Sequence, residues 1–195
     1  KFLDFFNEKI ILLKENNLKE RKIAERYNLE IYSTEQNLLI GGGINFLVDR
    51  IKSKYFIIIQ NDFELINDDF KNQLESGIRL IKKNIINCLR LRSIKYPGYP
   101  CYGKDRIPEP EGDLPSTHIS ELIYNDENNL NNVSIKYPHI FKKNTDENIV
   151  IVSSNYSNYT ENPCLYNTDW YRNNIYKFNG NNHSINSEQQ VQDIW

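Results

Sequence analysis

The stretch Lys54–Leu65, KYFIIIQNDFEL, decides the fold. Its first part, Tyr55 to Gln60, consists of six residues suited to a buried β-strand. The run passes directly into four residues that suit a strand end rather than a strand: Asn61, Asp62, Phe63 and Glu64. In open α/β sheets, ligands bind beyond the carboxyl ends of the strands, so we expect these side chains at a ligand-binding edge.

Strand and helix patterns alternate on both sides of this stretch. Before it, the expected order is a strand (9–13), a helix (18–27), a strand (29–33), a turn-rich loop (37–43) and a helix (44–51). After it come a helix (68–83), a strand (85–91), a loop (96–114), strands (133–137 and 148–153), a loop (156–163) and helices (168–176 and 188–195). Strands that alternate with helices of this length indicate parallel strands joined by right-handed crossovers. The sequence therefore predicts an α/β fold with a mostly parallel sheet.

Composition and charge narrow the class of protein. The chain has 195 residues, of which 39% are hydrophobic and 26% charged, as in ordinary globular proteins. A net charge of -2 and a pI near 6.0 give no long-range attraction for nucleic acid. No segment has the roughly 18 to 20 consecutive apolar residues of a membrane-spanning helix. We therefore expect a soluble domain with no nucleic-acid partner and no membrane-spanning segment in the given chain.

Two carboxylates follow the expected strand at alternate positions. If strand geometry continues to residue 64, the side chains of Asp62 and Glu64 point to the same side. Like charges so close together repel each other unless a cation lies between them. Mg²⁺ and Mn²⁺ prefer such oxygen ligands and complete their shells with water or diphosphate oxygens. The pair therefore predicts a divalent-metal site, and the alternative is a polar turn in which Asp62 caps the next segment.

The segment Gly41–Leu65, GGGINFLVDRIKSKYFIIIQNDFEL, resembles the central block of the GT-A glycosyltransferases. It is most similar to the family-2-like and β-1,4-N-acetylgalactosaminyltransferase-like group, in which a glycine-containing loop, a helix and an apolar strand lead to a D-x-D motif. Asn45 stands at the Asn of the helix opening, and Ile44 replaces the frequent Arg. If Phe63 marks the Phe after the motif, Gln60-Asn61-Asp62 occupies the triplet, and Asp62-Phe63-Glu64 is a shifted D-x-E substitute.

The resemblance implies a GT-A-like, Rossmann-type three-layer sandwich with a mostly parallel mixed sheet. On this alignment the family's first strand precedes residue 1, so we expect residues 1–195 to form a single glycosyltransferase-like catalytic domain that lacks it. The implied reaction is metal-dependent, inverting transfer of a sugar from a nucleotide sugar, most simply a UDP-sugar, to a hydroxyl of a glycan or glycoprotein. The implied donor site consists of Glu15, Asn45, Asn61 and Asp62. The implied ligands of Mn²⁺ or Mg²⁺ are Asp62, Glu64 and His183.

Further along the chain, the segment Tyr156–Asp169, YSNYTENPCLYNTD, resembles the loop and helix start that face the acceptor sugar in these enzymes. Flat aromatic rings suit stacking on sugars, and amides suit hydrogen bonds to hydroxyls. The resemblance implies an acceptor site made of Tyr156, Tyr159, Asn162 and Trp170. The alternative for the aromatic residues is ordinary packing.

An inverting transferase also needs a general base within hydrogen-bond reach of the acceptor hydroxyl. In the family this carboxylate commonly lies near the start of a helix late in the domain. Glu188, which opens EQQVQDIW, has that position, and Asp169 is the second candidate. The alternative for Glu188 is a first-turn glutamate that the helix dipole favours.

Two other classes of function remain open. A GT-A-like module that has lost turnover would bind glycans only, which suits the replacement of Arg by Ile44 and the altered acidic triplet. A metal-dependent nucleotidyltransferase would also use carboxylates, a divalent ion and an α/β sheet. The glycines at 41–43 match neither the P-loop nor the dinucleotide-binding pattern, which excludes those two classes.

Arg90 and Arg92 lie in the expected strand 85–91 and just beyond it, where they alternate with Leu89 and Leu91. Alternation places both arginines on one face of the strand. They could meet a phosphate or a charged acceptor there, or they could form ion pairs at the sheet edge.

Overall fold

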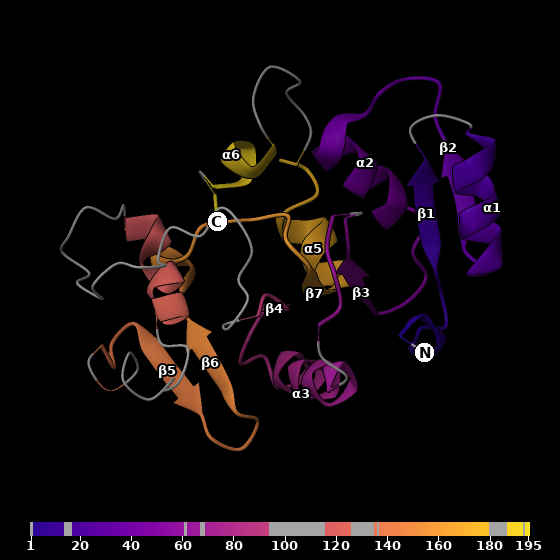
Figure 1. Ribbon diagram of the computed structural model, residues 1–195. Coiled ribbons are helices and arrows are strands. Elements are labelled where there is room, and N and C mark those ends of the chain that lie inside the picture. Colours follow the sequence, from indigo (N-terminus) through magenta and orange to yellow (C-terminus); the bar gives the residue numbers. More distant parts are fainter. Residues whose placement is uncertain are drawn as a thin grey trace. The chain divides into compact units, whose positions relative to one another are not determined.

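The computed structural model describes residues 2–13, 17–60, 62–66, 69–93, 116–125, 135, 137–179, 187–192 and 194–195. The chain forms two compact units: unit 1 holds Lys1–Leu89 and Cys164–Val191, and unit 2 holds Arg90–Pro163 and Gln192–Trp195 (Figure 1). The sequence patterns do not reveal that unit 2 has a core of its own. No helix in the described ranges is long and apolar enough to cross a membrane.

The first sheet of unit 1 is the predicted strand–helix–strand unit. Strands β1 (Ile10–Leu13) and β2 (Glu30–Ser33) pair in parallel, and α1 (Leu18–Arg26) connects them (Figure 1). The side chain of Asn17 accepts a hydrogen bond from the N–H of Lys19 at 2.9 Å and so caps the start of α1. The prediction for this part of the chain is confirmed. The observed ends of the three elements differ from the predicted ends by no more than one residue.

The second sheet lies mainly in unit 1 and has the order β3 (Tyr55–Ile58), β7 (Cys164–Asn167) and β4 (Cys88–Arg90), of which the last residue, Arg90, belongs to unit 2. Strands β3 and β7 are antiparallel, with Phe56 opposite Tyr166. Their rings stack at a centroid distance of 5.6 Å. The sequence patterns missed β7, which lies inside the segment expected to be a loop and a helix start.

Helix α2 (Leu39–Val48) begins earlier than the sequence suggested. The glycines at 41–43 were expected in a loop, but all three lie within α2. Gly43 is buried, and a Cβ atom there would lie 3.3 Å from the Leu12 side chain. The missing side chain thus allows α2 to pack closely on β1, which is a role for glycine inside a helix rather than a loop signal.

Three further helices belong wholly or mainly to unit 1: α3 (Phe70–Lys82), α5 (Thr168–Asn174) and α6 (Ser187–Gln192). Helices α3 and α5 lie within segments predicted to be helical, and α6 begins one residue before the predicted segment 188–195. The buried residues of α3 include Leu74, Leu80 and Ile81, which follow the helical period of the expected apolar face.

Unit 2 packs around a small apolar core. It contains η2 (Ser116–Asn125), the antiparallel pair β5 (Phe141–Asn144) and β6 (Ile149–Val152), and the short turn η3 (Ser154–Tyr156). The buried core residues are Leu122, Ile140 and Phe141. Tyr137, Val150, Val152 and Tyr156 are among the partly buried residues that pack against this core. The strand predicted at 148–153 is confirmed as β6, and β5 was not predicted.

The chain is therefore a mixed α/β protein with small sheets. Of the pairings defined by register among the described residues, β1–β2 is parallel, whereas β3–β7 and β5–β6 are antiparallel. The described strands do not form the expected three-layer sandwich around one mostly parallel sheet. The loop expected at 96–114 and most of the strand expected at 133–137 fall outside the described residues.

Glu8 ties the chain before β1 to the chain before β3. Its Oε2 accepts hydrogen bonds from the Ser53 N–H at 3.0 Å and the Ser53 hydroxyl at 2.7 Å, and from the Lys52 N–H at 3.1 Å. Partial burial alone would raise the pKa of Glu8. The hydrogen bonds from Ser53 and Lys52, together with the charge of Lys52, outweigh that effect and lower the pKa below the usual 4.5.

We expect Glu8→Gln to be less stable than the parent at neutral pH, with a difference that shrinks as the pH falls below about 4.5. Because the pKa of Glu8 is lower in the folded than in the unfolded protein, the ionised carboxylate stabilises the fold above the unfolded pKa. This contribution is lost as the pH falls through the folded pKa. Urea unfolding of both proteins between about pH 7 and about pH 3 measures the difference. A difference that does not change with pH would contradict this role.

Candidate functional site

The predicted acidic site lies on a turn directly after β3. The strand ends at Ile58, and the Phe63 N–H donates to the Gln60 carbonyl at 3.4 Å, which closes a turn that contains Asp62. Strand geometry therefore does not continue to residue 64, which was the condition under which Asp62 and Glu64 would point to the same side. Asp62 and Glu64 are both exposed, so both carboxylates are open to solvent at the end of the strand.

The side chains at this turn supply only some of the ligands that a metal ion needs. No group of three or more His, Cys, Asp and Glu side chains that could hold a metal occurs among the described residues. Glu15, Asn61 and His183, which were expected to contribute to donor or metal binding, fall outside those residues. Two exposed carboxylates fit a hard divalent ion that takes its other ligands from water or a diphosphate.

Asn45 was predicted to bind the nucleotide sugar, and the structure gives its amide nitrogen two partners within the protein. Nδ2 of Asn45 donates to the carbonyl of Tyr176 at 2.8 Å and to that of Asn179 at 2.6 Å. Asn179 is fully buried, and its own Nδ2 donates to the Tyr171 hydroxyl at 2.8 Å. Asn45 thus holds the chain that follows α5, through partners more than 130 residues away in the sequence.

Further polar contacts join the end of α2 to α5 and the turn after it. Nη2 of Arg172 donates to the carbonyls of Val48 at 2.6 Å and Ile51 at 2.9 Å. The hydroxyl of Tyr176 donates to Asp49 at 2.7 Å, and this hydrogen bond, with partial burial, raises the pKa of Tyr176. Sequence reasoning missed Arg172 and Tyr176, because no local spacing signals contacts between segments so far apart.

The two candidate general bases both lie in first turns of helices, as predicted. Asp169 is exposed in α5, whose start is capped by Asn167, which accepts a hydrogen bond from the Trp170 N–H at 3.0 Å. Glu188 is half-buried in the first turn of α6, and the fully buried Val191 anchors that helix. Negative charge is favourable at both positions because of the helix dipole.

The predicted acceptor-binding aromatics differ in how far they are covered. Trp170 is half-buried and stacks nearly parallel on Tyr166, with an interplanar angle of 5°. Tyr156 is half-buried against the core of unit 2. The Tyr159 side chain is only 2% exposed and lies 5.3 Å from the Trp195 ring, so a sugar could stack on it only if that cover moved.

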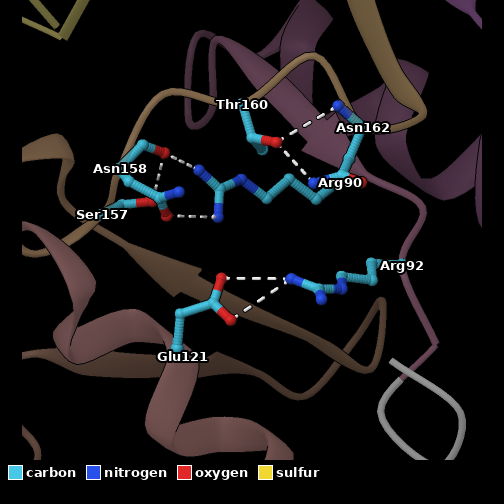
Figure 2. Close-up of polar contacts among 7 residues, drawn as sticks. All are labelled: Arg90, Arg92, Glu121, Ser157, Asn158, Thr160 and Asn162. Carbon is cyan, nitrogen blue, oxygen red and sulfur yellow. Dashed lines mark hydrogen bonds and ion pairs between the residues drawn. The ribbon is translucent and has the colours of Figure 1, made fainter. Parts of the chain in front are cut away.

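Unit 2 carries a group of polar side chains that includes the predicted Asn162 (Figure 2). The Thr160 hydroxyl accepts hydrogen bonds from the backbone N–H of Asn162 at 3.2 Å and from its Nδ2. The guanidinium of Arg90 donates to the side-chain and backbone oxygens of Asn158. Arg92 forms an ion pair with Glu121 at 3.2 Å, which is one of the two outcomes considered for the arginines.

The predicted residues therefore fall into two groups. Unit 1 contains the donor, metal and general-base candidates of the described chain together with Trp170, and unit 2 contains Tyr156, Tyr159 and Asn162.

Comparisons of the chain with protein-family models, with curated proteins and with solved structures gave no match.

Proposed function

We propose that this chain is a metal-dependent glycosyltransferase that moves a sugar from a nucleotide sugar, most simply a UDP-sugar, to a hydroxyl of a glycan or glycoprotein with inversion. The observation that carries the proposal is the succession of β2, α2 and β3, which ends in two exposed carboxylates, Asp62 and Glu64. The carboxyl end of a strand is where α/β proteins bind their ligands. The resemblance of Gly41–Leu65 to the GT-A central block supports the same assignment.

We further propose that unit 1 is a GT-A-like, Rossmann-type three-layer sandwich. Its parallel β1–α1–β2 unit and the α2–β3 succession are the repeating elements of such a fold. Glu8 holds the segments before β1 and β3 next to each other.

The chemistry follows from the side chains at the acidic turn and at the helix starts. Asp62 and Glu64 would hold Mn²⁺ or Mg²⁺, and the ion would supply neutralisation of the negative charge that develops on the departing diphosphate. Glu188 would accept the proton of the acceptor hydroxyl, with Asp169 as the second candidate. Trp170, which is half-buried, would stack on a sugar ring.

Donor binding is the direct test. We expect UDP-sugars with Mn²⁺ to raise the thermal unfolding temperature more than either component alone, because a ligand that binds only the folded state stabilises it by mass action. A ligand at about 100 times its Kd would contribute roughly 2.7 kcal/mol, which a thermal scan detects easily. Absence of any shift across a panel of nucleotide sugars, with and without Mn²⁺, would contradict the proposal.

A glycan-binding module without turnover is the second candidate. Two observations favour it. The amide of Asn45 donates to the protein's own backbone, and the described residues supply only some of the ligands that a metal ion needs. The same panel separates the two candidates. A module of this kind would bind glycans and would neither bind nucleotide sugars nor release nucleotide diphosphate from them.

A further inference from the structure

Arg90 and Arg92, both in unit 2, have opposite electrostatic environments. The side chain of Arg92 is 10% exposed and pairs with Glu121, whose side chain is 2% exposed. Arg90 is half-buried and, within the ranges that the structure describes, has no carboxylate partner. One guanidinium is thus neutralised within the protein, and the other is a partly buried cation with no counter-charge among the described residues.

Asn158 sets the direction of the Arg90 guanidinium. Nη1 lies 3.5 Å from Asn158 Oδ1, and Nη2 donates to the backbone carbonyl of the same residue. A guanidinium has five N–H donors in a planar fork, so these two contacts orient it and leave donors for a ligand. Partial burial of an unpaired charge costs free energy, and a bound anion would offset that cost.

Two further polar side chains follow Asn158 in the sequence. Thr160 and Asn162 are hydrogen-bonded to each other, and Figure 2 draws them together with Arg90 and Asn158. Thr160 is only 7% exposed, and its hydroxyl accepts both hydrogen bonds from Asn162, so its own O–H can still donate. A partly buried charge in contact with Asn158, with the hydroxyl of Thr160 two residues further along the chain, is a combination that suits a charged, hydroxyl-rich molecule rather than a purely apolar one.

We propose that Arg90, Asn158, Thr160 and Asn162 form a subsite for an anionic group on the acceptor sugar, so that the acceptor is an acidic glycan. An arginine fork binds carboxylate and phosphate oxygens through paired, charge-assisted hydrogen bonds. The anion is therefore either the carboxylate of an acidic sugar or a phosphate ester. The description of this ligand as an acceptor rests on the glycosyltransferase function proposed above.

Ligand-observed NMR titrations of the whole chain test this subsite, with glucuronic acid, glucose 6-phosphate and glucose as probes and without donor or metal. We expect at least one acidic probe to bind about tenfold more tightly than glucose, as charge-assisted hydrogen bonds imply. Comparison of the two acidic probes shows whether carboxylate or phosphate is preferred. Equal binding of all three, or tighter binding of glucose, would overturn the proposal.

Variants identify the group responsible. Arg90→Gln removes the charge and is expected to abolish the preference for acidic probes, whereas Arg90→Lys keeps the charge without the fork and is expected to retain part of it. Lys142→Gln removes the same charge from an exposed position on β5 of unit 2 and is expected to bind like the parent. Circular dichroism verifies the fold of each variant, and parent-like binding by folded Arg90→Gln would overturn the proposal.

The two proposals can fail separately, because these titrations contain no donor. If nucleotide sugars bind but acidic probes show no preference, the subsite is wrong and the transferase proposal stands. If acidic probes bind through Arg90 but no nucleotide sugar binds, the subsite stands as that of a glycan-binding module.

Discussion

Asp62→Asn is expected to reduce kcat/KM for sugar transfer by about 100-fold, and Glu64→Gln by a similar factor. Either change removes one of the two negative charges at the end of β3 that would hold the divalent ion against the leaving diphosphate. Both side chains are exposed, so loss of the charge alone should change the free energy of unfolding by no more than about 0.5 kcal/mol. A large fall in activity in a variant of unchanged stability is the combination that a metal-holding role predicts.

Initial rates at increasing Mn²⁺ concentration measure this effect. If the carboxylates hold the ion, both variants should need more Mn²⁺ to reach half of their maximal rate. Glu25→Gln, which neutralises an exposed carboxylate on α1 in the same unit, is the matched control and should behave like the parent. Asp62→Asn and Glu64→Gln proteins as active as the parent, at limiting Mn²⁺ as well as at saturation, would remove both residues from the mechanism.

Where local periodicity carries the signal, the sequence predicts the fold well. The helix expected at 18–27 is α1, and the apolar run at 148–153 contains β6. Both patterns are complete within a few residues, so nothing distant in the chain is needed to recognise them. The same holds for β3, whose apolar residues precede the acidic turn.

The failures have a common physical cause, which is that distant partners decide the structure. Strand β7 has four residues, follows Pro163, and exists because it pairs with β3 from far earlier in the chain. The glycines of α2 indicate a loop by composition, yet Gly43 is where the helix approaches Leu12 of β1. Local propensity cannot reveal either contact, because tertiary packing overrides it.

The candidate site also contains some features that the sequence predicts and others that depend on distant partners. The position of Asp62 and Glu64 after an apolar strand could be predicted, because strand end and acidic residues are adjacent in the sequence. The contacts of Asn45 could not, because the carbonyls that it binds belong to Tyr176 and Asn179. Tyr159 was expected to stack on a sugar, but its side chain is buried and its ring packs against Trp195 near the end of the chain.

Glu121→Gln is expected to lower the free energy of unfolding of unit 2 by about 3 to 5 kcal/mol. Glu121 is almost fully buried and accepts from Nη1 of Arg92 with both carboxylate oxygens, at 3.3 and 3.2 Å. The Arg92 guanidinium also lies over the Tyr124 ring, 4.9 Å from its centroid. Removal of the carboxylate charge would take the Glu121 counter-charge away from this buried cation, and that cost is much larger than the net contribution of the intact pair.

Glu75→Gln is the matched control for an exposed ion pair. Glu75 and Lys71 form such a pair on α3 at 4.0 Å, and loss of this pair should lower the free energy of unfolding by about 0.5 kcal/mol or less. Urea unfolding followed by Trp195 fluorescence in a Trp170→Phe background reports on unit 2, since Trp195 is then the one tryptophan of the sequence. The double variant Arg92→Leu/Glu121→Leu should regain much of the stability lost in Glu121→Gln, because it buries no unpaired charge. If Glu121→Gln were no more destabilising than Glu75→Gln, the Arg92–Glu121 pair would have to be open to water, contrary to the burial of both side chains.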